Sequence, residues 1–138
     1  MELTDEEADL LRESFYLVAA QGPKAADIFY RRLFALAPQV RPLFIGDLRR
    51  QGIMLTSTLG VVVAQIQSWQ NLTPIVTDLA LRHVAYGVRP EHYDIFREAL
   101  MGMLDDLSAE PLPDETRAVW LKAYSGLAEE MIASAYGE

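Results

Sequence analysis

The sequence contains no cysteine, and this absence excludes disulfide bonds, thiolate nucleophiles and zinc sites built from thiolates. Long hydrophobic runs are also missing, because an arginine, aspartate, glutamine or lysine interrupts each apolar stretch before it could span a bilayer. The first seven residues are acidic and lack the basic segment of a signal peptide. We therefore expect a cytoplasmic protein that does not enter a membrane.

Positive charge is scarce as well: 12 lysines and arginines stand against 20 aspartates and glutamates, and the formal net charge is −8 at pH 7. Such a chain is a poor partner for nucleic acids and for anionic membrane surfaces. A length of 138 residues with 51% hydrophobic content suits one domain, residues 1–138, with a substantial core.

Motifs for covalent or phosphate chemistry are absent. No serine lies in a G-x-S-x-G elbow, and no glycine-rich phosphate loop is present. The carboxylate pairs Asp105-Asp106 and Glu129-Glu130 are typical of solvated helix faces. No E-x-x-H motif supports a di-iron bundle. We therefore assign no catalytic residue.

The hydrophobic pattern predicts helices only, because no useful stretch alternates with period two. Thr4 and Glu7 have the spacing of a capping box, and Gly22-Pro23 breaks the first helix and starts the second. The second helix runs to Pro38, and a short helical piece covers residues 38–44. The pattern predicts an all-α domain of up to seven helices, either a bundle or globin-like.

The rest of the chain, from Asp47 onward, continues this pattern. Asp47 is expected to cap a long helix that reaches about Ser68. The segment Asn71 to Pro74 opens a fifth helix, which Gly87 closes. Pro90 fits the first turn of a sixth helix, and the last helix covers 114–136.

His83 is one of two histidines and lies in an apolar helical stretch that ends at Gly87. Such a histidine is more often a satisfied core residue than a ligand. Polar or aromatic side chains also interrupt the apolar stripes of other helices, namely Tyr30, Gln51, Tyr93 and Tyr124. Together with one imidazole they suit a haem pocket, with hydrogen-bonding groups across from the iron and aromatic rings around the macrocycle.

At this point the chain resembles a globin of the single-domain bacterial type, similar to the globin half of flavohaemoglobins and to neuroglobin-like chains. The resemblance covers nearly the whole chain and implies a globin fold of six to seven helices. It is carried by segments 29–34 (FYRRLF), 40–44 (VRPLF), 51–55 (QGIML), 82–88 (RHVAYGV), 92–93 (HY) and 120–124 (WLKAY).

The resemblance implies a role for each matching residue. His83 corresponds to the proximal ligand of the iron in haem b, with a backbone carbonyl of its own helix expected to orient the ring. Tyr30 corresponds to the distal tyrosine and Gln51 to the distal position usually held by His or Gln. Leu55 corresponds to the apolar residue one turn further on, over the gas ligand.

The haem faces and edges are matched by further residues. Phe44 corresponds to the phenylalanine that wedges against the haem face. Val88 and Tyr93 correspond to haem-edge contacts on the proximal side. Gly52 corresponds to a small residue at a close helix crossing, which we expect to lie against Ala26.

The chain departs from the family pattern in three places. Only residues 45–50 separate Phe44 from Gln51, so we expect a short connection after the third helix and no separate fourth helix. Met54 stands where many relatives have a basic residue, which leaves the haem propionates to water or to arginines elsewhere. Ala135 stands where flavohaemoglobins have a proximal glutamate, which removes that carboxylate's influence on the imidazole. The arginines available are Arg49, Arg50, Arg82 and Arg89.

The function implied is reversible binding of O₂, with NO and CO as further ligands, at a five-coordinate iron. Donors at Tyr30 and Gln51 predict tight binding, which suits scavenging, detoxification or sensing better than bulk oxygen transport. The alternatives are NO dioxygenation with an external reductase, a haem-based sensor, a non-haem globin-fold module, or a plain helical dimerisation domain. The chain is too short to include a flavin reductase domain, and either a monomer or a homodimer is compatible with the pattern.

Overall fold

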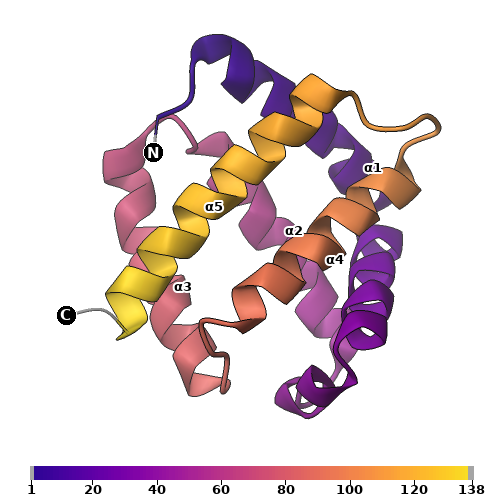
Figure 1. The fold of residues 1–138 in the computed structure, drawn as a ribbon, viewed down its shortest axis with the longest axis vertical. Helices are drawn as coiled ribbons and strands as arrows, with labels where there is room; N and C mark the ends of the chain where they lie inside the picture. The colour runs from indigo at the N-terminus through magenta and orange to yellow at the C-terminus, as the bar shows by residue number, and fades with distance from the viewer. Residues whose placement is uncertain (1, 137–138) are drawn as a thin grey trace.

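The computed structural model describes residues 2–136, and every regular element in this range is a helix. This confirms the all-α fold expected from the hydrophobic pattern. Residues 2–136 form five α-helices, which Figure 1 labels, and one 3₁₀ helix between the first two. The elements are α1 (Asp5–Leu36), η1 (Pro38–Leu43), α2 (Leu48–Ala64), α3 (Trp69–Ala85), α4 (His92–Leu107) and α5 (Asp114–Tyr136).

Helix α1 begins with the capping box that the sequence predicts. The Glu7 backbone N–H donates to the Thr4 hydroxyl at 3.1 Å, and the Glu7 carboxylate accepts from the Thr4 N–H at 2.9 Å. At Gly22 the backbone leaves helical geometry, with φ +23° and ψ −97°, and Pro23 follows. The predicted break is therefore a kink that re-aims one long helix, as the bend of α1 in Figure 1 shows.

The helices pack in two groups. Helix α1 packs on α2 and α4, whereas α3 packs mainly on α5. Across the core, the Trp120 indole N–H donates to the Ser14 hydroxyl at 2.7 Å and ties α5 to α1. In the described part of the chain α2 and α3 do not pack closely on each other. The space between α2 and α3 contains the main cavity of the protein.

Helix α1 crosses α2 at Gly52. A Cβ built on Gly52 would lie 2.7 Å from the Cβ of Ala26 and 3.7 Å from the ring of Tyr30. This confirms that Gly52 is the small residue at a close crossing with Ala26. The absence of a side chain lets α2 approach α1 beside the tyrosine.

The connection between η1 and α2 has no helix over residues 44–47, as expected from its length. Gly46 adopts φ +90°, and Asp47 caps α2 by accepting from the Arg49 N–H at 3.0 Å. Phe44 and α2 are thus joined by a short, tightly turned link.

The predicted end of α2 was wrong. The helix ends at Ala64, about four residues before Ser68, and closes through bonds from Gln65 to Val62 and from Ile66 to Val63. Ile66 is fully buried even though it belongs to the turn after the helix. Apolar spacing could not separate these two placements, because both bury Ile66.

Two helix starts also differ from the predictions. Helix α3 begins at Trp69, earlier than the expected Asn71 to Pro74, and contains Pro74 in its interior. Helix α4 begins at His92, after a turn in which the Tyr93 N–H donates to the Pro90 carbonyl at 3.2 Å. Proline marked the vicinity of each start, but its fixed φ is compatible with a turn as well as with a first helical turn.

Over residues 2–136 the helices are too short or too polar for any of them to cross a membrane.

Candidate functional site

A cavity of about 670 Å³ lies between α2 and α3, with walls from α1, α4 and α5. Its size is that of a pocket for a bound organic group, and its lining is mostly apolar. All seven residues that the resemblance assigns to the iron, the gas ligand or the haem faces and edges line this one cavity. They are Tyr30, Phe44, Gln51, Leu55, His83, Val88 and Tyr93.

His83 lies in the last turn of α3 and is half-buried. Its Nδ1 is 2.6 Å from the carbonyl oxygen of Leu79, one turn earlier. A carbonyl can only accept, so Nδ1 carries the proton and Nε2 keeps its lone pair. This confirms the expected backbone acceptor for the ring.

The charge state of His83 follows from its surroundings. Burial lowers the pKa of the imidazole below its ordinary value, and the positive charge of Arg82 acts in the same direction. The Leu79 carbonyl opposes both by holding the ring proton. The net direction favours a neutral imidazole, the form that ligates a metal.

Tyr30 projects from α1 into an aromatic cluster at the cavity wall. Its ring lies face to face with Phe34, with the centroids 6.0 Å apart, and meets Phe44 edge-on at 5.4 Å. The residue is 8% exposed, and its hydroxyl bonds to no other group within residues 2–136. Burial raises the pKa of Tyr30 to about 12, so the hydroxyl is a proton donor at neutral pH.

Gln51 lies in the first turn of α2, where it lines the cavity. Its side-chain Nε2 donates to the carbonyl oxygen of Ile45 at 2.6 Å. The amide therefore fastens the helix to the short connection before it, which the sequence pattern did not predict. Leu55, one turn on, adds an apolar wall, as its resemblance to the family implies.

Two tyrosines of the cavity wall, Tyr93 and Tyr124, lie near the start of α4, and Tyr136 lies outside the cavity lining. The Tyr124 hydroxyl donates to the backbone carbonyl of Tyr93 at 2.6 Å, and the Tyr136 hydroxyl donates to the carbonyl of Val88. The Tyr93 hydroxyl is fully buried and has no partner within residues 2–136. A buried hydroxyl of this kind carries a desolvation cost that no hydrogen bond within residues 2–136 offsets.

Several cavity residues were missed by the sequence reasoning. Helix α5 contributes Leu127 and Met131, which lie four residues apart on one helix face. That spacing could have indicated an inward face, but it is equally typical of ordinary core packing. The bond from Tyr136, which is outside the lining, to the cavity residue Val88 was also missed, because it joins residues far apart in the chain.

The arginines considered for the propionates have different surroundings. Arg82 is ion-paired with Asp78, with 2.6 Å between its nitrogen and the carboxylate oxygen. Arg49, Arg50 and Arg89 are exposed. Of these candidates, only Arg82 contributes directly to the cavity lining.

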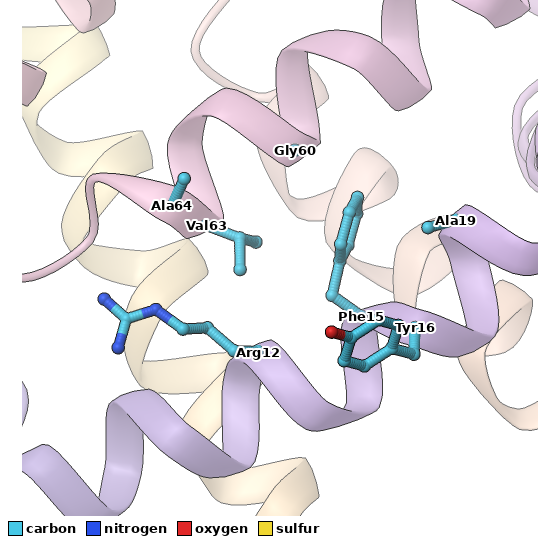
Figure 2. Close-up of a pocket in the computed structure, with 7 residues that line it drawn as sticks. All are labelled: Arg12, Phe15, Tyr16, Ala19, Gly60, Val63 and Ala64. Carbon is cyan, nitrogen blue, oxygen red and sulfur yellow. The ribbon is translucent and has the colours of Figure 1, made fainter.

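A second hollow, of about 460 Å³, lies where the first half of α1 faces the end of α2 (Figure 2). Phe15 and Tyr16 lie on one side of it, and Gly60 and Val63 on the other. Its one charged group, Arg12, donates to the side chain of Gln67 at 3.1 Å. The hollow is open to solvent, and its lining contains no histidine, cysteine or carboxylate, so it is not the candidate site.

The described residues 2–136 contain no group of three or more His, Cys, Asp or Glu that could hold a metal ion. The cavity offers a metal one imidazole, from His83. A metal bound there would have to bring most of its ligands with it, as the iron of a porphyrin does. The mostly apolar lining and the cavity volume of about 670 Å³ fit a large, mostly apolar group of this kind.

These features define a class: a helical protein with a mostly apolar cavity of cofactor size and one imidazole in its wall. The chain belongs to the globin family, whose sequence profile, described as Globin, matches residues 27–131.

Individual relatives agree with this family. The chain is 27% identical over 130 residues to a flavohemoprotein of Rhizobium meliloti, covering 92% of this chain and 32% of the relative. It is 28% identical over 137 residues to flavohemoprotein A of Dictyostelium discoideum, covering 96% of this chain and 34% of that protein. The chain thus spans about a third of the length of these relatives.

Among solved structures, the fold resembles a bacterial globin from Campylobacter jejuni. The TM-score is 0.82 at 24% identity, with 96% of both chains covered. This similarity confirms the globin fold expected from the sequence.

Proposed function

We propose that this globin binds haem b through His83 and holds O₂ reversibly, with NO and CO as further gas ligands. The observation that carries the proposal is the hydrogen bond between His83 Nδ1 and the Leu79 carbonyl in the wall of an apolar cavity. It leaves Nε2 as the free ligating atom of a neutral ring. When bound, haem would supply an iron atom that accepts a diatomic gas.

The residues around the cavity would then have different roles toward the haem. The Leu79 carbonyl holds the tautomer and orientation of His83, and burial keeps the ring neutral. Phe44 and Leu55 present apolar surface that excludes water. Val88 and Tyr93 would border the ring of the cofactor from the turn before α4 and from its first residues.

Tyr30 is the proposed donor to the gas ligand. Its hydroxyl is protonated at neutral pH, is held by packing against Phe34 and Phe44, and bonds to nothing else within residues 2–136. A hydrogen bond from such a donor would strengthen O₂ binding by roughly 1–3 kcal/mol. Gln51 would be the weaker donor, because its Nε2 is already engaged by the Ile45 carbonyl.

The absence of a distal histidine argues for a five-coordinate ferrous form. Among residues 2–136 the other histidine is His92, at the start of α4 and outside the cavity lining. Its Nδ1 accepts from the Arg89 backbone N–H at 3.0 Å. A six-coordinate spectrum of the ferrous, gas-free protein would contradict this part of the proposal.

Similarity to flavohemoproteins raises a second candidate, NO dioxygenation supported by an external reductase. The neighbourhood of His83 favours O₂ holding instead. Tyr93 has no carboxylate partner for its hydroxyl, and Ala135 stands where flavohaemoglobins have the glutamate. Stoichiometric nitrate formation from the oxygenated protein, followed by rapid re-reduction in a cell lysate, would favour the second candidate.

The experiment that tests the proposal compares the two histidines by absorbance. The purified protein should show a Soret band, or gain one with added haemin. His83→Ala should lose it while far-UV circular dichroism keeps its helical form. His92→Ala is the matched control and should retain the band. A protein that takes up no haemin, or a band that survives His83→Ala, would overturn the proposal.

A further inference from the structure

The charges of the chain are divided unevenly along its length. Residues 38–90, which include η1, α2 and α3, contain five arginines and two aspartates. The remaining residues contain seven basic and eighteen acidic side chains. Residues 38–90 thus carry a formal charge of about +3, whereas the rest of the chain carries about −11.

Within the described residues, four of the five arginines of this stretch have no acidic partner, and the fifth, Arg82, is paired with Asp78. Within residues 2–136 no ion pair involves Arg41, Arg49, Arg50 or Arg89. Elsewhere in that range every lysine and arginine except Lys24 is paired with a carboxylate. All four unpaired arginines are exposed.

Contacts between segments bring together the parts of the chain that carry these arginines, at one side of the cavity. A Cβ on Gly87 would lie 3.1 Å from the Cδ2 of Leu43, which brings the turn before Arg89 against the end of η1. The bond from Gln51 to the Ile45 carbonyl joins the first turn of α2 to the same region.

The same side of the cavity has exposed apolar side chains. Ile45 is 83% exposed and Met54 is 50% exposed, and both line the cavity. Ile53, 56% exposed, lies one helical turn from Arg49, as Met54 does from Arg50. Exposed apolar residues among arginines have the composition of a protein interface. We call this surface the arginine face, made of Arg41, Ile45, Arg49, Arg50, Ile53, Met54 and Arg89.

We propose that the arginine face docks an acidic one-electron carrier protein at the mouth of the haem cavity. This inference rests on the proposed function, since a ferric haem must regain an electron before O₂ can bind again. The carrier would lose one electron and the haem would gain it, with no bond formed or broken. The unpaired arginines supply charge complementarity to an acidic partner, and the isoleucines and Met54 supply the apolar contact.

The negative charges of the cofactor do not reverse this difference in charge. Two propionate carboxylates would reduce the formal charge of residues 38–90 to about +1, whereas the rest of the chain would remain near −11. The arginine face would still be the surface that an acidic protein approaches with least repulsion. The same overall acidity disfavours an anionic membrane, which would meet the acidic flanks of the molecule.

The test titrates the haem-loaded full chain with a plant-type [2Fe–2S] ferredoxin, a defined acidic one-electron carrier, by calorimetry. We expect binding in 20 mM salt that weakens about tenfold or more in 200 mM salt. Reduction of the ferric protein by the reduced ferredoxin should saturate with ferredoxin concentration and show the same salt dependence.

Variants locate the docking surface. Arg49→Glu and Ile53→Glu should each weaken ferredoxin binding by about tenfold. Lys24→Glu changes the net charge by the same amount as Arg49→Glu, but at the unpaired lysine on α1, and should change binding less than about twofold. Ile53 does not line the cavity, so its variant should keep the Soret band and the O₂ dissociation rate.

Three results would overturn the inference. They are absence of ferredoxin binding in 20 mM salt, equal weakening by Lys24→Glu and Arg49→Glu, and an arginine face that instead binds phosphatidylglycerol vesicles or a second copy of the chain. A chain that takes up no haemin overturns the proposed function. A haem-loaded chain that binds O₂ but not ferredoxin overturns the docking proposal alone.

Discussion

The Tyr124 hydroxyl donates a hydrogen bond of 2.6 Å to the backbone carbonyl of Tyr93, whose own hydroxyl is buried without a partner. Two phenols in one region of the cavity wall therefore have opposite energetic roles. The Tyr124 hydroxyl stabilises the start of α4 from α5, whereas the Tyr93 hydroxyl carries a desolvation penalty that nothing within residues 2–136 offsets.

Removing these two hydroxyls should have opposite effects on the haem-free protein. Tyr93→Phe should leave the free energy of unfolding unchanged or raise it by up to about 1 kcal/mol, because it deletes an unsatisfied group. Tyr124→Phe should lower it by about 0.5–1.5 kcal/mol. Urea unfolding of the two variants checks this, and a Tyr93→Phe variant destabilised by more than Tyr124→Phe would show that the Tyr93 hydroxyl has a partner in solution.

Tyr30→Phe should speed O₂ dissociation from the haem-loaded protein by about 5- to 150-fold, because it removes a donor worth roughly 1–3 kcal/mol. Packing against Phe34 and Phe44 should be retained, since the ring stays. Stopped-flow displacement of O₂ by CO measures the rate. Tyr93→Phe removes the same atom from another part of the cavity and should change the rate little.

Gln51→Leu should accelerate O₂ dissociation less than Tyr30→Phe does in the same assay. The reason is that Gln51 Nε2 already donates to the Ile45 carbonyl and would have to leave it, or use its second N–H, to serve the ligand. A larger effect from Gln51→Leu would mean that the amide turns into the cavity when haem and gas are bound.

The crossing of α1 and α2 offers a comparison of two glycines in one helix. Gly52→Ala would place its methyl 2.7 Å from Ala26 Cβ and should lower the free energy of unfolding by about 1–2 kcal/mol. Gly60→Ala would meet Phe15 at an ordinary 3.6 Å and should be neutral or stabilise by about 0.5–1 kcal/mol through helix propensity. Thermal and urea unfolding measure both, and equal effects would contradict the close crossing.

Alkaline pH should destabilise the haem-free protein. Burial raises the pKa of Tyr30 to about 12, and the pKa of Tyr93 is also raised to about 12, mainly by burial and further by Tyr136. An unfolded tyrosine titrates near pH 10, so the unfolded state binds fewer protons than the folded state between about pH 10 and 12. The associated stability is present below about pH 10 and is lost as the pH rises through about 12.

Urea unfolding at pH values from 9 to 11.5 tests this sign. The wild-type protein should lose stability across the range, and the double variant Tyr30→Phe/Tyr93→Phe should lose less. Parallel curves for the two proteins would show that these hydroxyls are solvated in the folded state.

Much of the fold could be predicted because its signals are local. The Thr4–Glu7 capping box, the interruption of helical geometry at Gly22 and the helix-free link after Phe44 depend on neighbouring residues, although a kink in one helix stands where a break between two was expected. The boundaries that were wrong lie where local signals are ambiguous. Ile66 is buried whether it belongs to a helix or to the turn that follows it.

The cavity lining could be predicted for seven residues because they match a family pattern, and the structure brings all seven together. The partners of their polar atoms could not. That Gln51 bonds to Ile45 and that Tyr136 bonds to Val88 depend on how segments meet in space.

The sequence by itself therefore determined the helical class, the globin resemblance and the imidazole in an apolar helix, since periodicity and residue identity are properties of the chain. The tertiary structure alone decided which donors are free and which are occupied: Tyr30 and Tyr93 keep unbonded hydroxyls, while the Gln51 amide is engaged. It also brought together the segments that carry the unpaired arginines, namely η1, the first turn of α2 and the turn before α4. The physical reason is that hydrogen bonds and ion pairs act over a few ångströms, and only folding brings atoms of separate segments within that range.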